Sequence, residues 1–409
     1  MKLFVCLFLL CVALCAPSAR ADARKPKYVH GAPALATQTT AFSSAEARLI
    51  EIYRLIGKSE TQVAIKKAEH LVKDFPNFQL AQLVYGDLLS SRVRVVKSVG
   101  DVPVTQHKQA DHILQDLHDE SRQRIKALRE RPPAGSIPSE FMLLSARSRY
   151  AMAVDASRSR LYLFDNQERG LTLIADFYIS IGKSGLEKMA EGDLRTPLGV
   201  YFITSRLNPS SLKDYYGAGA LPINYPNVLD TKRGKTGSGI WLHGTPQAQF
   251  SRPPLASDGC IVLSNPDLKF ILKTVKINHT PVIISKALKW VAPHSVRIEA
   301  NRFQQTLKAW VHAKNSGQIK DVAAFYASDF ISNGKSLAEW LPTLEREVSS
   351  ARGRTIELKD LSLLHWTDAS NTMLVSFGEV QTGQRSGVSK RQYWARQNNQ
   401  WKIFFEGVI

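Results

Sequence analysis

The chain has 409 residues, with 54 Lys and Arg against 36 Asp and Glu, and its formal net charge is +18 at pH 7. The positive charge is spread along the sequence rather than gathered in one basic arm. This argues against nucleic-acid binding and favours attraction to anionic polymers or membrane surfaces. A chain of this length exceeds what one hydrophobic core usually organises, so two or three domains are expected.

The N-terminus has the pattern of a secretory signal. A basic residue precedes an apolar run over 3–16, and a small-residue cleavage site ends at Ala21. We therefore expect a signal peptide at 1–21 and an exported, periplasmic protein. No later stretch reaches the roughly 20 apolar residues that a transmembrane helix needs, so none is expected.

The cysteines point to one residue. Cys6, Cys11 and Cys15 lie within the expected signal, so only Cys260 remains after cleavage, without a partner for an intramolecular disulfide. A lipid anchor at Cys11 or Cys15 is the alternative, but Leu precedes each of them where a small residue is usual. The Cys260 thiol is buried and inert, forms a disulfide with another chain, or takes part in chemistry. The residues around it in the sequence are needed to choose among these roles.

Residues 22–44 lack periodicity and predict a flexible leader, whereas 45–146 predict a helical region. Its first half faintly resembles a tetratricopeptide helix pair. A further helix is expected from Lys108 to about Arg131. Four of its side chains could gather as a metal site, but a solvated charged face is the preferred interpretation. They are His112, Asp116, Asp119 and Glu120.

From Tyr150 the apolar period changes to that of strands, and 147–286 are expected to form a mainly β domain. The expected strands cover 150–154, 160–164, 171–174, 177–181, 199–204, 239–243 and 281–285.

The last part of the chain, 294–409, predicts helices first and an antiparallel sheet afterwards. This order resembles the α+β cone of NTF2-like domains. The expected helices cover 296–314 and 319–330, and the expected strands cover 355–365, 372–380, 390–396 and 400–406.

One segment of the β domain carries residues suited to nucleophilic chemistry. A predicted strand ends at His243, and Cys260 follows seventeen residues later, directly after Gly259. A thiol nucleophile needs a neighbouring base or cation that promotes its deprotonation. A glycine before it lets the backbone turn sharply and aim N–H groups at an oxyanion. Both requirements can be met here.

This arrangement resembles the L,D-transpeptidase (YkuD-type) catalytic domain, whose motif is His, a loop, and then Ser/Thr-His-Gly-Cys. The resemblance covers about 150–285 and includes Arg195-Thr196-Pro197 and Asn224-Tyr225-Pro226. It implies that Cys260 is the nucleophile and His243 its base. It also implies an oxyanion loop at Ser257, Asp258 and Gly259, and substrate contacts at Tyr225, Gly244 and Asn265.

Two positions depart from the family motif. Asp258 stands where His is usual, and Val262 stands where Arg is usual. An anionic neighbour should raise the pKa of the thiol, and the missing Arg removes a contact that orders the site or the substrate carboxylate. Cations that could compensate are Arg252, Lys232, Arg233 and Lys235.

The resemblance implies a periplasmic enzyme that attacks peptidoglycan tetrapeptide stems and holds the acyl group as a thioester on Cys260. An amine acceptor would give cross-linking or protein anchoring. Two alternatives stay open: a hydrolase of the same bonds, and a non-catalytic scaffold that binds peptidoglycan. The expected partners are stem peptides and, through the flanking domains, envelope proteins; no cofactor, metal or nucleic acid is expected.

Overall fold

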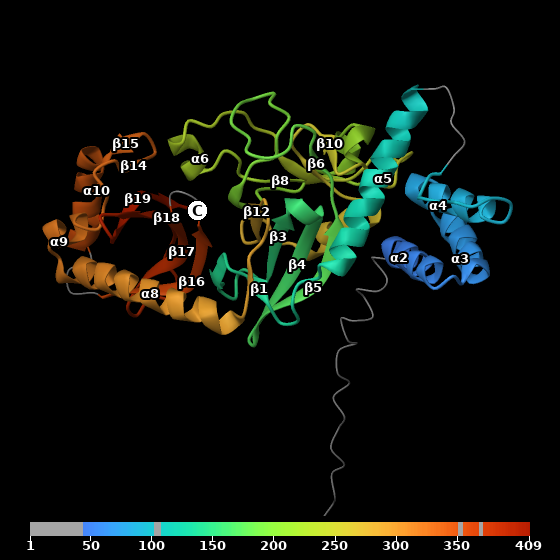
Figure 1. Cartoon of the computed structure of the whole chain (residues 1–409). Helices are drawn as coiled ribbons and strands as arrows, with labels where there is room; N and C mark the ends of the chain where they lie inside the picture. Colours follow the sequence, from blue (N-terminus) through green and yellow to red (C-terminus); the bar gives the residue numbers. More distant parts are fainter. Residues whose placement is uncertain (1–43, 102–107, 351–354, 368–370) are drawn as a thin grey trace, which may run out of the picture. The chain divides into compact units, whose positions relative to one another are not determined.

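The computed structural model describes residues 44–101, 108–350, 355–367 and 371–409 (Figure 1). The expected signal peptide and all but the last residue of the expected leader lie outside these ranges. No helix within them is long and apolar enough to span a membrane.

The N-terminal region is helical, as the sequence predicts. Its helices are α2 (Ser44–Gly57), α3 (Thr61–Asp74), α4 (Gln79–Ser90) and α5 (Lys108–Arg129). The apolar stripes of α2, α3 and α4 close on a core that includes Leu49, Ile52, Leu71 and Leu80, all fully buried. Burial of one stripe per helix is what makes such short helices stable.

An ion cluster joins this helical region to the β domain. The Glu46 carboxylate of α2 accepts hydrogen bonds of 2.8 and 2.6 Å from Arg160 and pairs with Arg124 of α5 at 2.8 Å. Burial by itself would raise the pKa of Glu46, but the two guanidinium groups lower it to about 2. The carboxylate is therefore charged, and its partners supply the compensation that a buried charge requires.

The middle domain is built on a five-stranded sheet in the order β5-β4-β3-β12-β7. Strand β12 pairs parallel with β3 and antiparallel with β7, so the end of the domain closes beside its beginning. The strands are β3 (Tyr150–Asp155), β4 (Arg160–Gln167), β5 (Gly170–Tyr178), β7 (Gly199–Phe202) and β12 (Pro281–Ser285).

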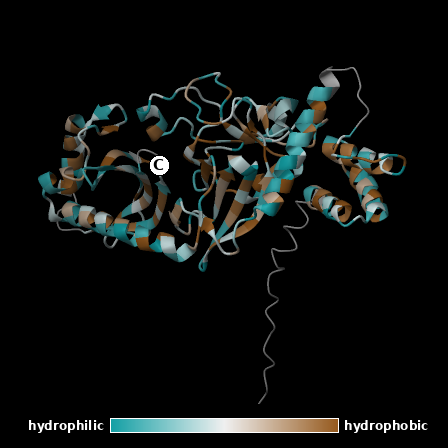
Figure 2. Cartoon of the chain, in the orientation of Figure 1, coloured by the Kyte–Doolittle hydropathy of each residue, from teal (hydrophilic) through white to brown (hydrophobic). Residues whose placement is uncertain are grey.

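Smaller sheets pack against this one. Sheet β11-β9-β8 shares an apolar core with the large sheet, formed by residues such as Met152, Leu163, Leu242 and Ile261. Figure 2 shows hydrophobic residues along the central strands, as expected for a sheet covered on its faces. The remaining elements are β6 (Ile181–Gly182), β8 (Ala220–Pro222), α6 (Val228–Lys232), β9 (Trp241–His243), β10 (Leu255–Ser257), β11 (Ile261–Val262) and α7 (Asn265–Thr274).

The C-terminal domain is an α+β unit with the antiparallel order β19-β18-β17-β16-β2. The edge strand β2 (Phe141–Leu143) comes from before the middle domain, although the sequence grouped it with the helical region. Strand β1 (Ile137–Pro138) likewise pairs with β13 (Trp290–Val291). The other strands are β14 (Ile331–Ser332), β15 (Lys335–Ser336), β16 (Ile356–Trp366), β17 (Thr372–Gln381), β18 (Val388–Gln397) and β19 (Gln400–Val408).

The helices of this domain differ partly from the prediction. Helix α8 (Pro293–Ser316) agrees, but α9 (Ile319–Ala323) is shorter than the helix expected over 319–330. Helix α10 (Leu337–Ser350) was not predicted, and it holds Pro342 in its interior, where proline removes a backbone hydrogen bond. Burial of Leu344 and Val348 in the domain core stabilises α10 despite this loss.

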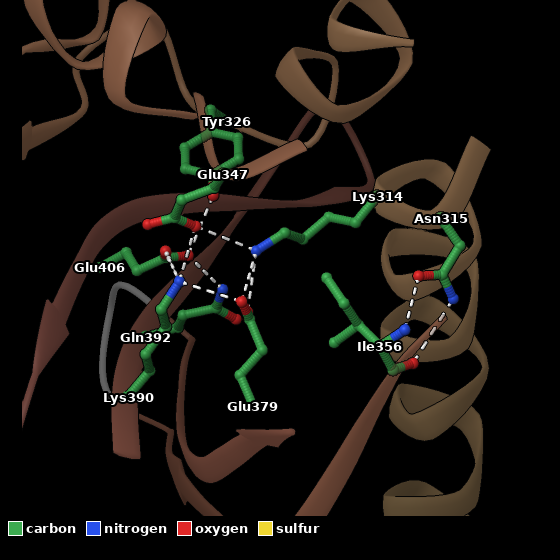
Figure 3. A network of polar contacts seen from close by, with 9 residues as sticks. All are labelled: Lys314, Asn315, Tyr326, Glu347, Ile356, Glu379, Lys390, Gln392 and Glu406. Carbon is green, nitrogen blue, oxygen red and sulfur yellow. Dashed lines mark hydrogen bonds and ion pairs between the residues drawn. The ribbon is translucent and has the colours of Figure 1, made fainter. Parts of the chain in front are cut away.

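A buried polar network ties the helices of this domain to its sheet (Figure 3). Lys314 of α8 contacts Glu347 of α10 at 3.1 Å and Glu379 of β17 at 2.8 Å. Lys390 of β18 contacts Glu347 at 2.8 Å and Glu406 at 3.3 Å. Burial opposes the charge on Lys390, but the Glu406, Glu379 and Glu347 carboxylates raise its pKa well above the usual range. Charged groups so enclosed stabilise a fold only when all are paired.

We expect Lys314→Met to destabilise the C-terminal domain by about 3 kcal/mol, because it leaves buried carboxylates with less compensation. Denaturant unfolding followed by tryptophan fluorescence checks this, since Trp310 and Trp394 are buried in the same core. Lys308→Met, on the exposed side of α8, is the matched control and should change stability by less than about 0.5 kcal/mol. Equal effects of the two substitutions would contradict this assignment.

Candidate active site

Parallel pairing of two short strands places the predicted nucleophile next to the strand that carries the predicted base. Strand β9 ends at His243, and β11 begins immediately after Cys260. Ile261 is paired with Leu242 and Val262 with His243, and the Leu263 N–H donates to the His243 carbonyl at 2.9 Å. Cys260 therefore lies beside the strand that carries the histidine, although the two residues are seventeen positions apart in sequence.

The His243 ring is fully buried and held in one orientation. Its Nδ1 lies 2.7 Å from the Gly244 carbonyl, which can only accept, so Nδ1 carries the proton. Within the described part of the chain, the buried Nε2 has no hydrogen-bond partner. Burial lowers the pKa of His243 to about 4. The ring is therefore neutral near neutral pH, and Nε2 is an unoccupied proton acceptor.

Two tyrosines of the short 3₁₀ turn Asp214–Tyr216 flank this ring. The Tyr215 and Tyr216 ring centroids lie 5.7 and 5.1 Å from that of His243. Sequence reasoning missed both residues, because the only signal is an aromatic pair in a segment without strand or helix periodicity. Their packing restricts solvent access to the histidine.

The Cys260 thiol is protonated in the free protein. Burial is the main effect that raises the pKa of this thiol to about 11, and the nearby Asp258 carboxylate adds to it. The Trp241 N–H and the charge of Arg252 act in the opposite direction. The thiol donates to the Gly239 carbonyl at 3.4 Å. Cys260 and His243 are thus both neutral at rest, and deprotonation of the thiol must accompany any nucleophilic attack.

The loop before the cysteine is shaped by Ser257 and Gly259. The buried Ser257 hydroxyl donates to the Cys260 carbonyl at 2.6 Å and accepts from the Gly259 N–H at 3.2 Å. Gly259 has φ of +120°, and a Cβ there would come 2.7 Å from the Arg195 carbonyl oxygen. The Thr196 hydroxyl donates to the Gly259 carbonyl at 2.9 Å. Only glycine fits this conformation, and the tight turn follows from it.

Asp258 points into solvent and pairs with Lys183 at 2.9 Å. The two side chains are 61% and 52% exposed, so the pair contributes little to stability. Its hydrogen bond with Asp258 raises the pKa of Lys183. After burial, Asp258 also raises the pKa of Cys260, which is the direction expected for an anionic neighbour.

The three residues expected to contact substrate all make contacts within the protein. Asn265 accepts a hydrogen bond from the Ala218 N–H and donates to the Thr245 carbonyl, both at 2.8 Å. A Cβ at Gly244 would collide with the Asn265 side-chain oxygen. Tyr225 is buried, and its hydroxyl donates to the Thr236 carbonyl at 3.1 Å. These contacts favour a structural role, and substrate binding by these residues stays a prediction.

Of the cations considered as compensation, Arg252 has an effect on the thiol. Its charge lowers the pKa of Cys260. Lys232 instead pairs with Asp329 at 2.5 Å, and Lys235 pairs with Asp230 at 2.9 Å. The loop between His243 and Cys260 thus contributes a cation that the family motif places after the cysteine.

The charged residues of α5 do not converge on one point. His112 pairs with Asp116 at 3.3 Å near solvent, whereas Glu120 is buried against Arg124 at 2.7 Å. Within the described ranges, no group of three or more His, Cys, Asp or Glu side chains is arranged to hold a metal ion.

Two parts of the chain match known families. Residues 149–284 match the L,D-transpeptidase catalytic domain (YkuD), and residues 302–407 match the Cds6 C-terminal NTF2-like domain. The chain therefore contains an L,D-transpeptidase catalytic domain followed by an NTF2-like domain. Both the family resemblance and the three-part fold class predicted from the sequence are confirmed.

Solved structures resemble more of the chain than these two domains. Bd1075 of Bdellovibrio bacteriovorus is 25% identical, with a TM-score of 0.57 over 67% of this chain and 98% of Bd1075. The helical cell shape determining protein Pgp2 of Campylobacter jejuni is 20% identical, with a TM-score of 0.51 over 70% of this chain and 99% of Pgp2. A search of curated proteins gives no significant match.

We expect Cys260 to react slowly with iodoacetamide near neutral pH, about two orders of magnitude more slowly than free cysteine, because its raised pKa leaves little thiolate. The rate should rise about tenfold per pH unit into the alkaline range. Peptide mass spectrometry of Cys260 checks this.

His243→Ala is the informative companion to this alkylation experiment. If the resting pair is neutral, the substitution should leave the alkylation profile of Cys260 almost unchanged. A fast reaction near neutral pH that disappears in His243→Ala would instead reveal a thiolate–imidazolium pair and contradict the neutral assignment.

Proposed function

We propose that this protein is a peptidoglycan L,D-transpeptidase of the cell envelope, with Cys260 as nucleophile and His243 as general base. The observation that carries the proposal is the buried Nε2 of His243, which lies on the strand beside Cys260 and has no hydrogen-bond partner among the described residues. Such a nitrogen is costly to leave unpaired. A role as proton acceptor for the neighbouring thiol accounts for it.

In the proposed reaction, Cys260 Sγ attacks the carbonyl carbon of the third residue of a tetrapeptide stem. The thiol proton moves to His243 Nε2 as the C–S bond forms. Backbone N–H groups of the turn that Ser257 and Gly259 shape, with the Cys260 amide as the principal donor, stabilise the oxyanion. The C–N bond then breaks, and D-alanine leaves as an amine with the proton that His243 returns.

The thioester that remains on Cys260 decides the product. An amine from a second stem would displace the thiol and form a cross-link, and a protein lysine would give anchoring. Water would release a tripeptide, which makes hydrolysis of the same stems the second candidate function. The departures at Asp258 and Val262 from the family motif favour this candidate. Because Pgp2 is described as a cell shape determining protein, the proposal extends to cell-shape maintenance.

We expect the purified protein to remove D-alanine from tetrapeptide-bearing muropeptides, as detected by mass spectrometry. Cys260→Ala should abolish the reaction, and His243→Ala should slow it about 10²- to 10⁴-fold, because base catalysis is lost. Cross-linked dimers would identify transpeptidation, and tripeptides without dimers would identify hydrolysis.

Lys269→Gln is the control for this assay, since Lys269 is exposed on α7 and outside the site, and its rate should equal that of the wild type. An unchanged muropeptide profile with the wild-type protein would overturn the catalytic proposal and favour the peptidoglycan-binding scaffold.

A further inference from the structure

The loop between His243 and Cys260 carries a buried guanidinium without a carboxylate. Arg252 is 8% exposed. It donates to the Tyr215 hydroxyl at 3.0 Å and to the Tyr215 carbonyl at 3.4 Å, and it lies 4.3 Å from the centre of the Tyr215 ring. Among the residues that the structure describes, no Asp or Glu forms an ion pair with it.

Arg252 lies close to both reacting groups. The charge of its guanidinium lowers the pKa of Cys260 and, secondary to burial, that of His243. Tyr215, which Arg252 contacts with its guanidinium, also flanks the His243 ring. Tyr215 thus links the Arg252 guanidinium to the His243 ring.

The N-terminal helices hold this loop in place. Phe250 stacks on Phe78 at a centroid distance of 4.2 Å, and its N–H donates to the Asn77 carbonyl at 3.1 Å. Ser251 donates to Glu120 of α5 at 2.7 Å. The Arg252 carbonyl itself accepts a hydrogen bond from the Tyr178 hydroxyl at 2.9 Å. Three successive loop residues are thus anchored, and the arginine is preorganised.

Removing a guanidinium from water costs free energy, and a carboxylate partner offsets that cost better than neutral groups do. The contacts with Tyr215 use only part of the donor set of Arg252, and the planar guanidinium matches a carboxylate in bidentate geometry. A carboxylate supplied by the substrate would provide the missing partner.

We propose that Arg252 binds a carboxylate of the stem peptide next to the scissile bond, so that the helical region, by holding Arg252, is part of the substrate site. This inference rests on the proposed function. The carboxylate can come from the terminal D-alanine or from the side chain of the diamino acid at the third position. Both offer the same chemistry, and the experiment distinguishes them.

Binding without turnover tests the inference. Three forms of the tetrapeptide stem are titrated calorimetrically into full-length Cys260→Ala protein. They are the free acid, the C-terminal amide and the side-chain amide. One amide should bind about 10- to 100-fold more weakly than the free acid, and that amide identifies the carboxylate bound. Adding Arg252→Gln should remove the difference, whereas adding Lys269→Gln should preserve it.

Arg252→Lys and Phe250→Ala extend the test. Lysine keeps the positive charge but lacks the planar guanidinium that binds a carboxylate through two hydrogen bonds. The preference for the free acid should therefore be larger than in Arg252→Gln and smaller than with Arg252. Phe250→Ala loosens the anchor and should also reduce that preference. Thermal unfolding of each variant identifies any that fails to fold. The affinity for the amide that binds more weakly should not change among folded variants, so it serves as an internal reference.

The outcomes separate this inference from the catalytic proposal. If binding prefers the free acid and this preference depends on Arg252, the carboxylate site is supported. If the wild type also leaves muropeptides unchanged, catalysis is refuted. Suppose that the wild type releases D-alanine but binds the free acid and the amides equally, or that the preference for the free acid persists in Arg252→Gln. Either result would overturn the role of Arg252 and leave the catalytic proposal in place.

Discussion

The main-chain pairing of β9 with β11 is the constraint on which the candidate site depends. It places Cys260 beside the strand of His243, and it does so through backbone hydrogen bonds that require no particular side chain. The surrounding apolar core buries the histidine, and its Nε2 finds no partner in the part of the chain that the structure describes. The same burial disfavours both an imidazolium and a thiolate, so the chemistry of the pair follows from the packing around it.

The helical region contributes to this site through the loop that separates the two residues. Glu46 connects the helices to the β domain by a buried ion pair with Arg160, and Phe78 packs on the loop itself. Arg124 also lies 4.0 Å from the ring centre of Tyr178, and the Tyr178 hydroxyl donates a hydrogen bond to the Arg252 carbonyl. The contacts that anchor the loop therefore form one continuous group. A substitution that removes one of these contacts should therefore weaken the others.

The C-terminal domain is connected to the catalytic domain by the chain on both sides. Strand β2 precedes the catalytic domain in sequence yet completes the C-terminal sheet, and β1 pairs with β13 where the chain leaves that domain. Inside the C-terminal domain, charged residues of α8, α10 and three strands share one buried network (Figure 3). These contacts give the domain a core that is partly ionic rather than uniformly apolar.

The order of the domains and most of the strands could be predicted from the amino-acid sequence, which also singled out Cys260 and His243 as the candidate pair. These predictions use apolar periodicity and a local motif, which are properties of neighbouring residues. The remaining features depend on contacts between distant segments. Helix α10 exists because its apolar face is buried in spite of Pro342, and β2 joins a sheet whose other strands lie more than two hundred residues further on. Contacts of the helical region with the loop, of Arg252 with Tyr215 and of Tyr215 with His243 join distant segments, which no local pattern encodes.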